Sequence, residues 1–224
     1  MDAFYGGIGD DKILTERDHQ VLRFLAESRF CTPDQLIKAG IFKCSRKRCL
    51  NRLIDLKKDG FLKSGRLSQG QAYYFLTPAG GEAIELPDPW YSRRYRNARE
   101  NKVVRELIYT DFAITMEVKY LDRKDIFDCL NGAGYEALNK IFKAQDRDRY
   151  FKINEVLHAL ILDYYYSLKS LAARVSAYTK LPHELRDKVV INILTFSLSR
   201  KAQLARLITK YPINVKIYKA DLKY

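Results

Sequence analysis

Apolar residues recur every three to four positions in three stretches near the start of the chain, which is the spacing of one face of an α-helix. The first predicted helix spans about 15–28, because Thr15, with Asp18 three positions on, resembles a capped helix start. Thr32, followed by a proline, begins a short second helix that ends before Gly40. Two helices are therefore expected before residue 40.

A third helix is predicted from Ser45, whose hydroxyl can cap it, to the stop signal Asp59-Gly60. Its apolar positions are expected to be buried: Cys49, Leu50, Leu53, Ile54 and Leu56. Its basic positions are expected to stay outside: Arg46, Lys47, Arg48 and Arg52. The helix is thus predicted to present a cationic face to solvent.

Two apolar runs, 61–67 and 71–76, follow this helix and are joined by Ser68-Gln69-Gly70, which predicts a β-hairpin. Three helices followed by a hairpin is the order of a winged helix-turn-helix. The segment Leu76-Thr77-Pro78-Ala79-Gly80 resembles the strand-to-helix exit of many bacterial domains of this kind. Residues 1–85 are therefore predicted to form a winged helix-turn-helix domain.

A linker is predicted over 86–98. Pro87 and Pro89 cannot continue a helix, because proline lacks a backbone donor and restrains the residue before it. Aromatic and basic residues then alternate, as in segments that follow a nucleic-acid strand. A basic linker with its aromatic side chains packed between two domains fits the pattern equally well.

The remainder, 99–224, alternates between helical and strand-like stretches. A helix is predicted over 99–117, whereas 130–142 gives no clear assignment. From residue 152 onward the order is β-α-β-α-β, with apolar runs at 156–166, 188–196 and 213–218 and helices at 167–179 and 199–211. This order indicates a small α/β domain with a partly parallel sheet. The chain as a whole is predicted to be α+β.

Charge adds a functional indication. The formal net charge of +13 raises affinity for polyanions such as nucleic acid or anionic membranes. No stretch is apolar enough to span a bilayer and the first residues lack the layout of a secretory signal, so a cytoplasmic protein without membrane insertion is expected. The four cysteines form no CxxC pair and have no histidine at metal-ligand spacing, so no zinc is expected. No Walker loop or GxGxxG fingerprint is apparent, and no cofactor is expected.

Duplex DNA is the polyanion that the first domain suits best. In a winged helix-turn-helix the third helix enters the major groove and the hairpin reaches the flanking backbone or the minor groove. Arginine can bond guanine bidentately, asparagine can do the same for adenine, and lysine and serine suit phosphates. The predicted DNA contacts are Ser45, Arg46, Lys47, Arg48, Asn51 and Arg52 on the helix, Lys63, Arg66 and Gln71 on the hairpin, and Arg93, Arg94 and Arg96 in the linker.

Three motifs carry a wider resemblance: 76–80, 163–170 leading into a helix with Arg174 and Tyr178, and 189–196 before Ser199-Arg200. Together they resemble the replication-relaxation family of plasmid mobilisation proteins, over most of the chain. The resemblance implies a winged helix followed by a domain similar to the restriction-endonuclease fold.

Nucleases of that fold hold a divalent metal between acidic side chains, with a lysine near the attacking water. By position, Asp163 matches one carboxylate, Lys169 the basic residue and Glu155 the upstream acid. The pattern departs from the family at Tyr165, where a second acid is expected, and no Pro-Asp precedes Glu155. The resemblance therefore implies a nuclease-like scaffold that has lost cleavage, and Mg²⁺ or Mn²⁺ is needed only if the chain nicks DNA.

Three functions stay open. The first is duplex DNA binding by an accessory protein of plasmid transfer or replication, or by a transcriptional regulator. The second is a metal-dependent, relaxase-like DNA nickase. The third is a protein-interaction or assembly subunit whose basic charge is incidental. A homodimer fits any of the three, since winged helices often dimerise, but no heptad pattern indicates an interface.

Overall fold

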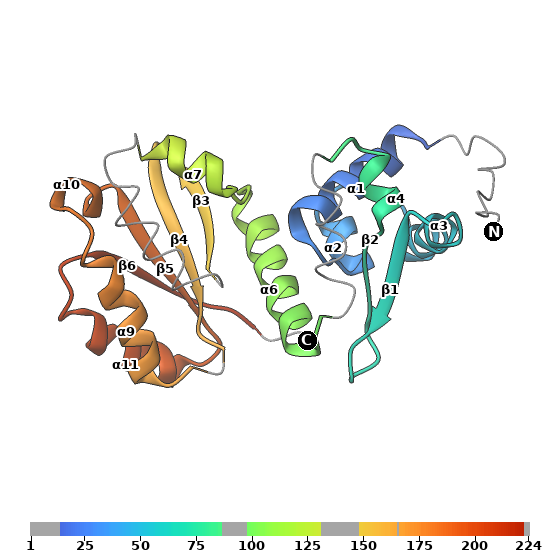
Figure 1. Ribbon diagram of the computed structural model, residues 1–224. Helices are drawn as coiled ribbons and strands as arrows, with labels where there is room; N and C mark the ends of the chain where they lie inside the picture. The colour runs from blue at the N-terminus through green and yellow to red at the C-terminus, as the bar shows by residue number, and fades with distance from the viewer. Residues whose placement is uncertain (1–13, 87–97, 131–147, 165, 222–224) are drawn as a thin grey trace, which may run out of the picture. The chain divides into compact units, whose positions relative to one another are not determined.

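The computed structural model describes residues 14–86, 98–130, 148–164 and 166–221 (Figure 1). The chain divides into two compact units, Met1–Ile114 and Thr115–Tyr224. It is a mixed α+β protein, with helices and a β-hairpin in the first unit and a mixed four-stranded sheet with helices in the second. That class agrees with the α+β prediction.

The first unit has the predicted order of three helices followed by a hairpin. Its elements are α1 (Glu16–Ser28), α2 (Pro33–Lys38), α3 (Arg46–Lys58), β1 (Leu62–Arg66), β2 (Ala72–Leu76), α4 (Pro78–Glu82) and α6 (Glu100–Met116), which ends just inside the second unit. The predicted N-caps are confirmed, because the side chains of Thr15, Thr32 and Ser45 each accept a hydrogen bond from the backbone three residues on. Local capping chemistry therefore accounts for where these helices begin.

One core holds α1, α2, α3 and the hairpin together. It consists of Val21, Leu22, Leu25, Cys31, Leu36, Phe42, Cys49, Leu53, Leu56, Leu62, Tyr74 and Leu76. The prediction that Leu50 and Ile54 would also be buried is wrong, since Leu50 is only half-buried and Ile54 is 42% exposed. Successive helix residues are 100° apart, so a face centred on Cys49, Leu53 and Leu56 leaves Ile54 on the far side.

Helix α6 belongs mainly to the first unit, although the sequence placed it in the C-terminal domain with a boundary at 86–98. Gln35 of α2, which is 2% exposed, donates to the Leu107 carbonyl of α6 at 2.7 Å. The buried Glu106 carboxylate pairs with Arg29, at 3.5 Å, and with Arg105. These polar contacts explain why the first unit extends to Ile114.

The second unit contains the predicted β-α-β-α-β order with additional elements. Its elements are α7 (Arg123–Cys129), β3 (Arg149–Ile153), β4 (Val156–Leu162), α9 (Leu168–Tyr178), α10 (His183–Arg186), β5 (Val189–Thr195), α11 (Leu198–Ile208) and β6 (Asn214–Lys219). The sheet order is β3-β4-β5-β6, with β3 antiparallel to β4 and the other pairs parallel. The partly parallel sheet is thus confirmed.

Helices α9 and α11 cover one face of this sheet (Figure 1). Their buried Leu171, Val175 and Leu204 join one core with Ala159 and Ile191 of the central strands. The predicted strand to residue 166 is too long, because β4 ends at Leu162. Tyr164 and Tyr166 therefore lie beyond the end of the strand.

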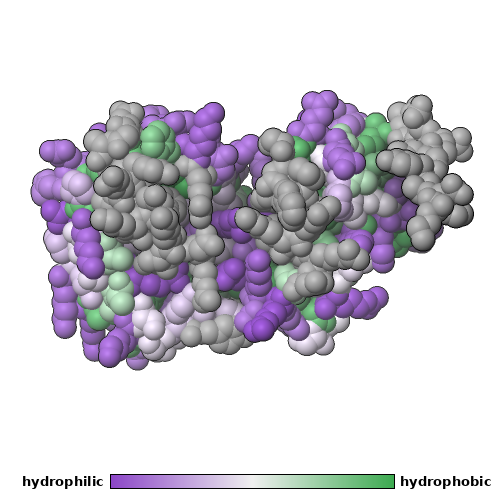
Figure 2. Space-filling view, viewed as in Figure 1, coloured by the Kyte–Doolittle hydropathy of each residue, from purple (hydrophilic) through white to green (hydrophobic). Residues whose placement is uncertain are grey.

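The face of the protein seen in Figure 2 is mostly polar where it is coloured. In the space-filling view, hydrophilic side chains cover most of the coloured surface of each unit and the hydrophobic patches are small (Figure 2). Within the described part of the chain, no helix combines the length and the apolar character needed to cross a membrane.

Candidate nucleic-acid interface

The outward face of α3 is polar and basic. The helix sequence, RKRCLNRLIDLKK, carries six basic residues and one acid. Lys47, Arg48 and Asn51 are exposed, and none of the three has a side-chain partner among the described residues. At 100° per residue, Lys47 and Asn51 lie almost directly opposite the buried face of the helix. The core thus fixes the backbone of α3, while these three side chains have no partner among the described residues.

The start of α3 adds a second electrostatic contribution. Ser45 accepts a hydrogen bond from the Arg48 backbone at 3.5 Å, which leaves other backbone N–H groups of the first turn without a partner within the helix. The helix dipole places partial positive charge at this end, and its first turn holds no acidic residue. An anion such as a phosphate is therefore favoured beside Ser45 and Lys47.

Arg46 forms an exposed ion pair on the same helix. Its Nε donates to Asp34 Oδ1 of α2 at 2.7 Å, and the two side chains are 58% and 54% exposed. The hydrogen bond to Asp34 raises the pKa of Arg46. Because such pairs are worth little in water, Arg46 can exchange Asp34 for a phosphate at small cost.

Arg52 has a structural role instead. It donates to both carboxylate oxygens of Asp18 in α1, at 2.7 and 2.5 Å, and the Asp18 side chain is 1% exposed. Burial raises the pKa of Asp18, but the hydrogen bonds from Arg52 and Thr15 outweigh it, and the net shift is downward. The Arg52 guanidinium therefore holds α3 against α1. Of the six residues of this helix and its N-cap that were predicted to contact DNA, Arg52 is the least exposed.

The predicted DNA contacts on the hairpin lie on two different faces of its strands. Side chains alternate between the two faces of a strand, so Lys63 and Arg66, three residues apart, point to opposite faces. The Arg66 face carries Leu62 and Tyr74, which belong to the core shared with α3. Lys63 shares its face with Phe75, whose ring contacts Phe30.

Gln71, half-buried beside the turn, lies on the Lys63 face. Arg66 is exposed on the strand face that carries the core residues Leu62 and Tyr74, whereas Lys63 is exposed on the other face. The three linker arginines, Arg93, Arg94 and Arg96, lie outside the described residues.

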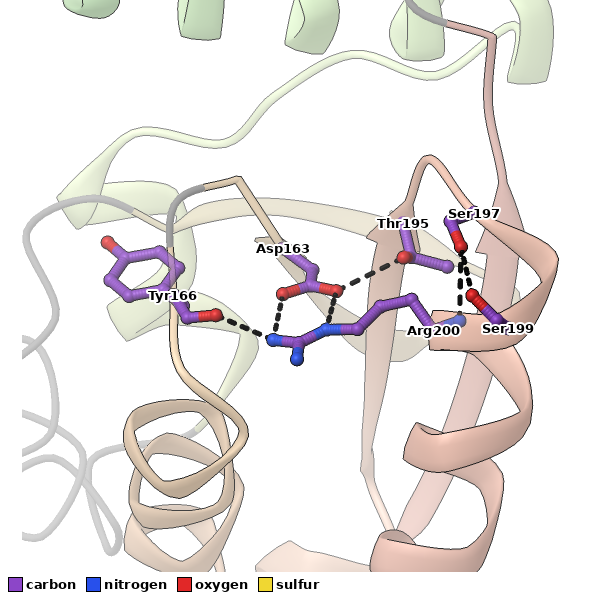
Figure 3. Close-up of polar contacts among 6 residues, drawn as sticks. All are labelled: Asp163, Tyr166, Thr195, Ser197, Ser199 and Arg200. Carbon is purple, nitrogen blue, oxygen red and sulfur yellow. Dashed lines mark hydrogen bonds and ion pairs between the residues drawn. The ribbon is translucent and has the colours of Figure 1, made fainter.

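The suggested metal ligands do not form a site. Asp163 follows β4, and Arg200 of α11 donates to its Oδ2 and Oδ1, each at 2.9 Å. Thr195 donates to the same carboxylate at 3.1 Å, and the Tyr166 carbonyl accepts from Arg200 at 2.6 Å. Figure 3 shows the guanidinium between Asp163 and that carbonyl. The carboxylate is already neutralised by a cation from the protein.

Glu155 lies at the opposite end of the same strand. It occupies the turn between β3 and β4 with φ 63°, is 87% exposed and pairs with Lys152. Asp163 lies eight positions further along the extended chain, which corresponds to about 25 Å. Lys169 is exposed near the start of α9. Within the described ranges there is no group of three or more metal-ligating side chains.

Two exposed residues of the α3 face, Ile54 and Lys58, were not among the DNA contacts predicted from the sequence. The signal is present in the spacing, because 47, 51, 54 and 58 recur at i, i+4, i+7 and i+11 and so share a face. The sequence prediction placed Ile54 in the core only because its side chain is hydrophobic.

Searches against protein-family models, curated proteins and solved structures gave no match to this chain.

Proposed function

We propose that this protein binds duplex DNA, with the first unit acting as a winged helix-turn-helix whose α3 enters the major groove. The observation that supports this most is the free polar face of α3, where Lys47, Arg48 and Asn51 are exposed and lack partners among the described residues. Those residue types bond phosphates and base edges. The net charge of +13 gives the chain a general attraction for the polyanion.

Helix α3 also has the rigidity that a groove-reading helix needs. The Arg52–Asp18 ion pair and the core at Cys49, Leu53 and Leu56 fix it against α1. Arg66 extends the basic surface onto the hairpin, which would contact the flanking backbone. A protein-interaction subunit would not require this combination of an immobile helix and unpaired cationic donors.

The resemblance to plasmid mobilisation proteins supports a place in plasmid transfer or replication, and a transcriptional regulator would use the same surface. Cleavage is not proposed, because Asp163 is paired with Arg200 and Glu155 lies at the other end of β4. On this proposal the second unit is a binding or assembly module.

Binding to labelled duplex DNA over a salt series tests the proposal. Lys47→Ala/Arg48→Ala should weaken binding about tenfold or more and reduce the slope of log K against log salt by about 0.9 for each phosphate that the variant no longer binds. The matched control is Arg206→Ala/Lys210→Ala, which removes one arginine and one lysine from exposed positions in the second unit. Equal weakening in the two variants would show that α3 has no special role, and absence of wild-type binding would refute the proposal.

A further inference from the structure

A large aliphatic side chain lies on the outward face of α3. Ile54 is 42% exposed, and among the described residues only Met116, Phe127 and Leu198 are other large hydrophobic side chains left exposed. Ile54 is followed one turn later by Lys58, which is also exposed. An apolar group within one turn of Asn51, Lys57 and Lys58 adds nothing to a surface that binds phosphates alone.

The geometry places Ile54 beside Asn51. The two residues are three positions apart, which places them about 4.5 Å apart along the helix axis and about 60° apart around it, so their side chains are neighbours on one face. Base pairs stack about 3.4 Å apart. Two side chains with this offset reach the same or adjacent base pairs of a groove that runs along the helix.

The chemistry of the two side chains matches one kind of base pair. In the major groove, adenine presents the N7 acceptor with the N6 donor, and the Asn51 amide can bond both. Thymine presents the 5-methyl group, which is the apolar feature that an aliphatic side chain can cover there. Ile54 is β-branched and stiff at χ1, so its methyl groups are held in place before DNA arrives.

We propose that Asn51 and Ile54 make the site specific for A·T pairs, with Asn51 bonding adenine and Ile54 packing on the methyl group of a thymine in the same or the next base pair. This inference rests on the proposed DNA binding. The flanking Lys47 and Lys58 favour DNA over an apolar protein partner as the occupant of this face.

The test removes only the methyl group. Preferred sites are first selected from a random duplex library with the full-length protein, and each thymine of the best site is then replaced by deoxyuridine. At one thymine, wild-type affinity should fall about three- to fivefold, which corresponds to one buried methyl group. Ile54→Ala should bind the thymine and deoxyuridine duplexes equally at that position, and Asn51→Ala should relax the preference for adenine there or next to it.

Controls separate this inference from the parent proposal. Ile54→Val should keep the thymine preference. Leu198→Ala removes a more exposed aliphatic side chain, 70% against 42%, from the second unit and should change nothing. If Ile54→Ala weakens binding but remains as sensitive to deoxyuridine as the wild type, or if no thymine matters, Ile54 does not read the methyl group. Absence of any DNA binding by the wild type would instead refute the proposed function itself.

Discussion

Two arginines of α3 form bidentate pairs with aspartates and differ in exposure, which makes them a matched test of what burial does to an ion pair. Arg52 meets Asp18 and Arg46 meets Asp34, and in both pairs Nε donates to Oδ1 at 2.7 Å. The Asp18 side chain is 1% exposed, whereas that of Asp34 is 54% exposed. We expect Arg52→Ala to destabilise the first unit strongly and Arg46→Ala to leave it almost unchanged.

The expected magnitudes follow from what each mutation leaves behind. Removing one partner of a buried pair costs about 3–5 kcal/mol, because the remaining charge is uncompensated. Two features reduce this for Arg52→Ala. The Arg52 side chain is 33% exposed, and Asp18 keeps the hydrogen bonds from the Thr15 backbone and hydroxyl at 2.8 and 2.7 Å. A decrease of about 2–3 kcal/mol in the free energy of unfolding is therefore expected, against at most about 1 kcal/mol for Arg46→Ala.

Native-state hydrogen exchange read by mass spectrometry measures this effect in the full-length chain. Peptides from α1 and α3 report the free energy of opening of the first unit, and peptides from β4 and β5 serve as the internal reference. A difference below about 0.5 kcal/mol between the two variants would refute the reasoning. So would equal changes in the reference peptides, because the pair lies entirely within the first unit.

The same structure supports three further predictions. The pKa of Asp18 is held below its ordinary value of 3.8, so its contribution to stability is complete above about pH 4 and is lost as the pH falls through the lower folded-state pKa. In a series of urea denaturations at different pH values, Asp18→Asn should lack that part of the acid transition. A Cβ at Gly80 would overlap the Phe61 carbonyl oxygen, so Gly80→Ala should cost about 2–3 kcal/mol in thermal unfolding, whereas Gly81→Ala, which meets only the Leu86 side chain, should stay within about 1 kcal/mol of wild type. Asp163→Ala leaves the Arg200 guanidinium uncompensated and should destabilise the second unit by about 3 kcal/mol, measured by hydrogen exchange. Glu155 is exposed, and Glu155→Ala should not destabilise this unit. Stabilisation of the wild type by Mg²⁺ at Asp163 would contradict this structural role.

Local signals in the sequence predicted the helices of the first unit closely. Thr15, Thr32 and Ser45 act within three residues of themselves, so their effect on helix starts can be inferred without the fold. The alternation of strands could also have separated Lys63 from Arg66, since a spacing of three residues always changes face. That inference needed only the hairpin, which the turn residues already predicted.

Long-range pairing could not be predicted in the same way. Asp18 reaches Arg52 across 34 positions and Asp163 reaches Arg200 across 37, and no local pattern indicates which arginine ends beside which carboxylate. Strand β3 has five residues and becomes stable only by pairing with β4, so a short apolar run could not reveal it. The candidate site therefore differs from the sequence prediction at two positions. Arg52 pairs with Asp18 instead of facing solvent, and Ile54 is exposed instead of buried.

The position of α6 bears on how the first unit is made. Gln35 and Arg29 find their partners Leu107 and Glu106 more than 70 residues further along the chain. At about 5–20 residues per second of synthesis, the 38 residues from the end of β2 to Ile114 take roughly 2–8 seconds. During that interval Gln35 and Arg29 lack these native partners. The first unit can therefore complete its packing only after α6 has been synthesised, because the partners of Gln35 and Arg29 lie on that helix.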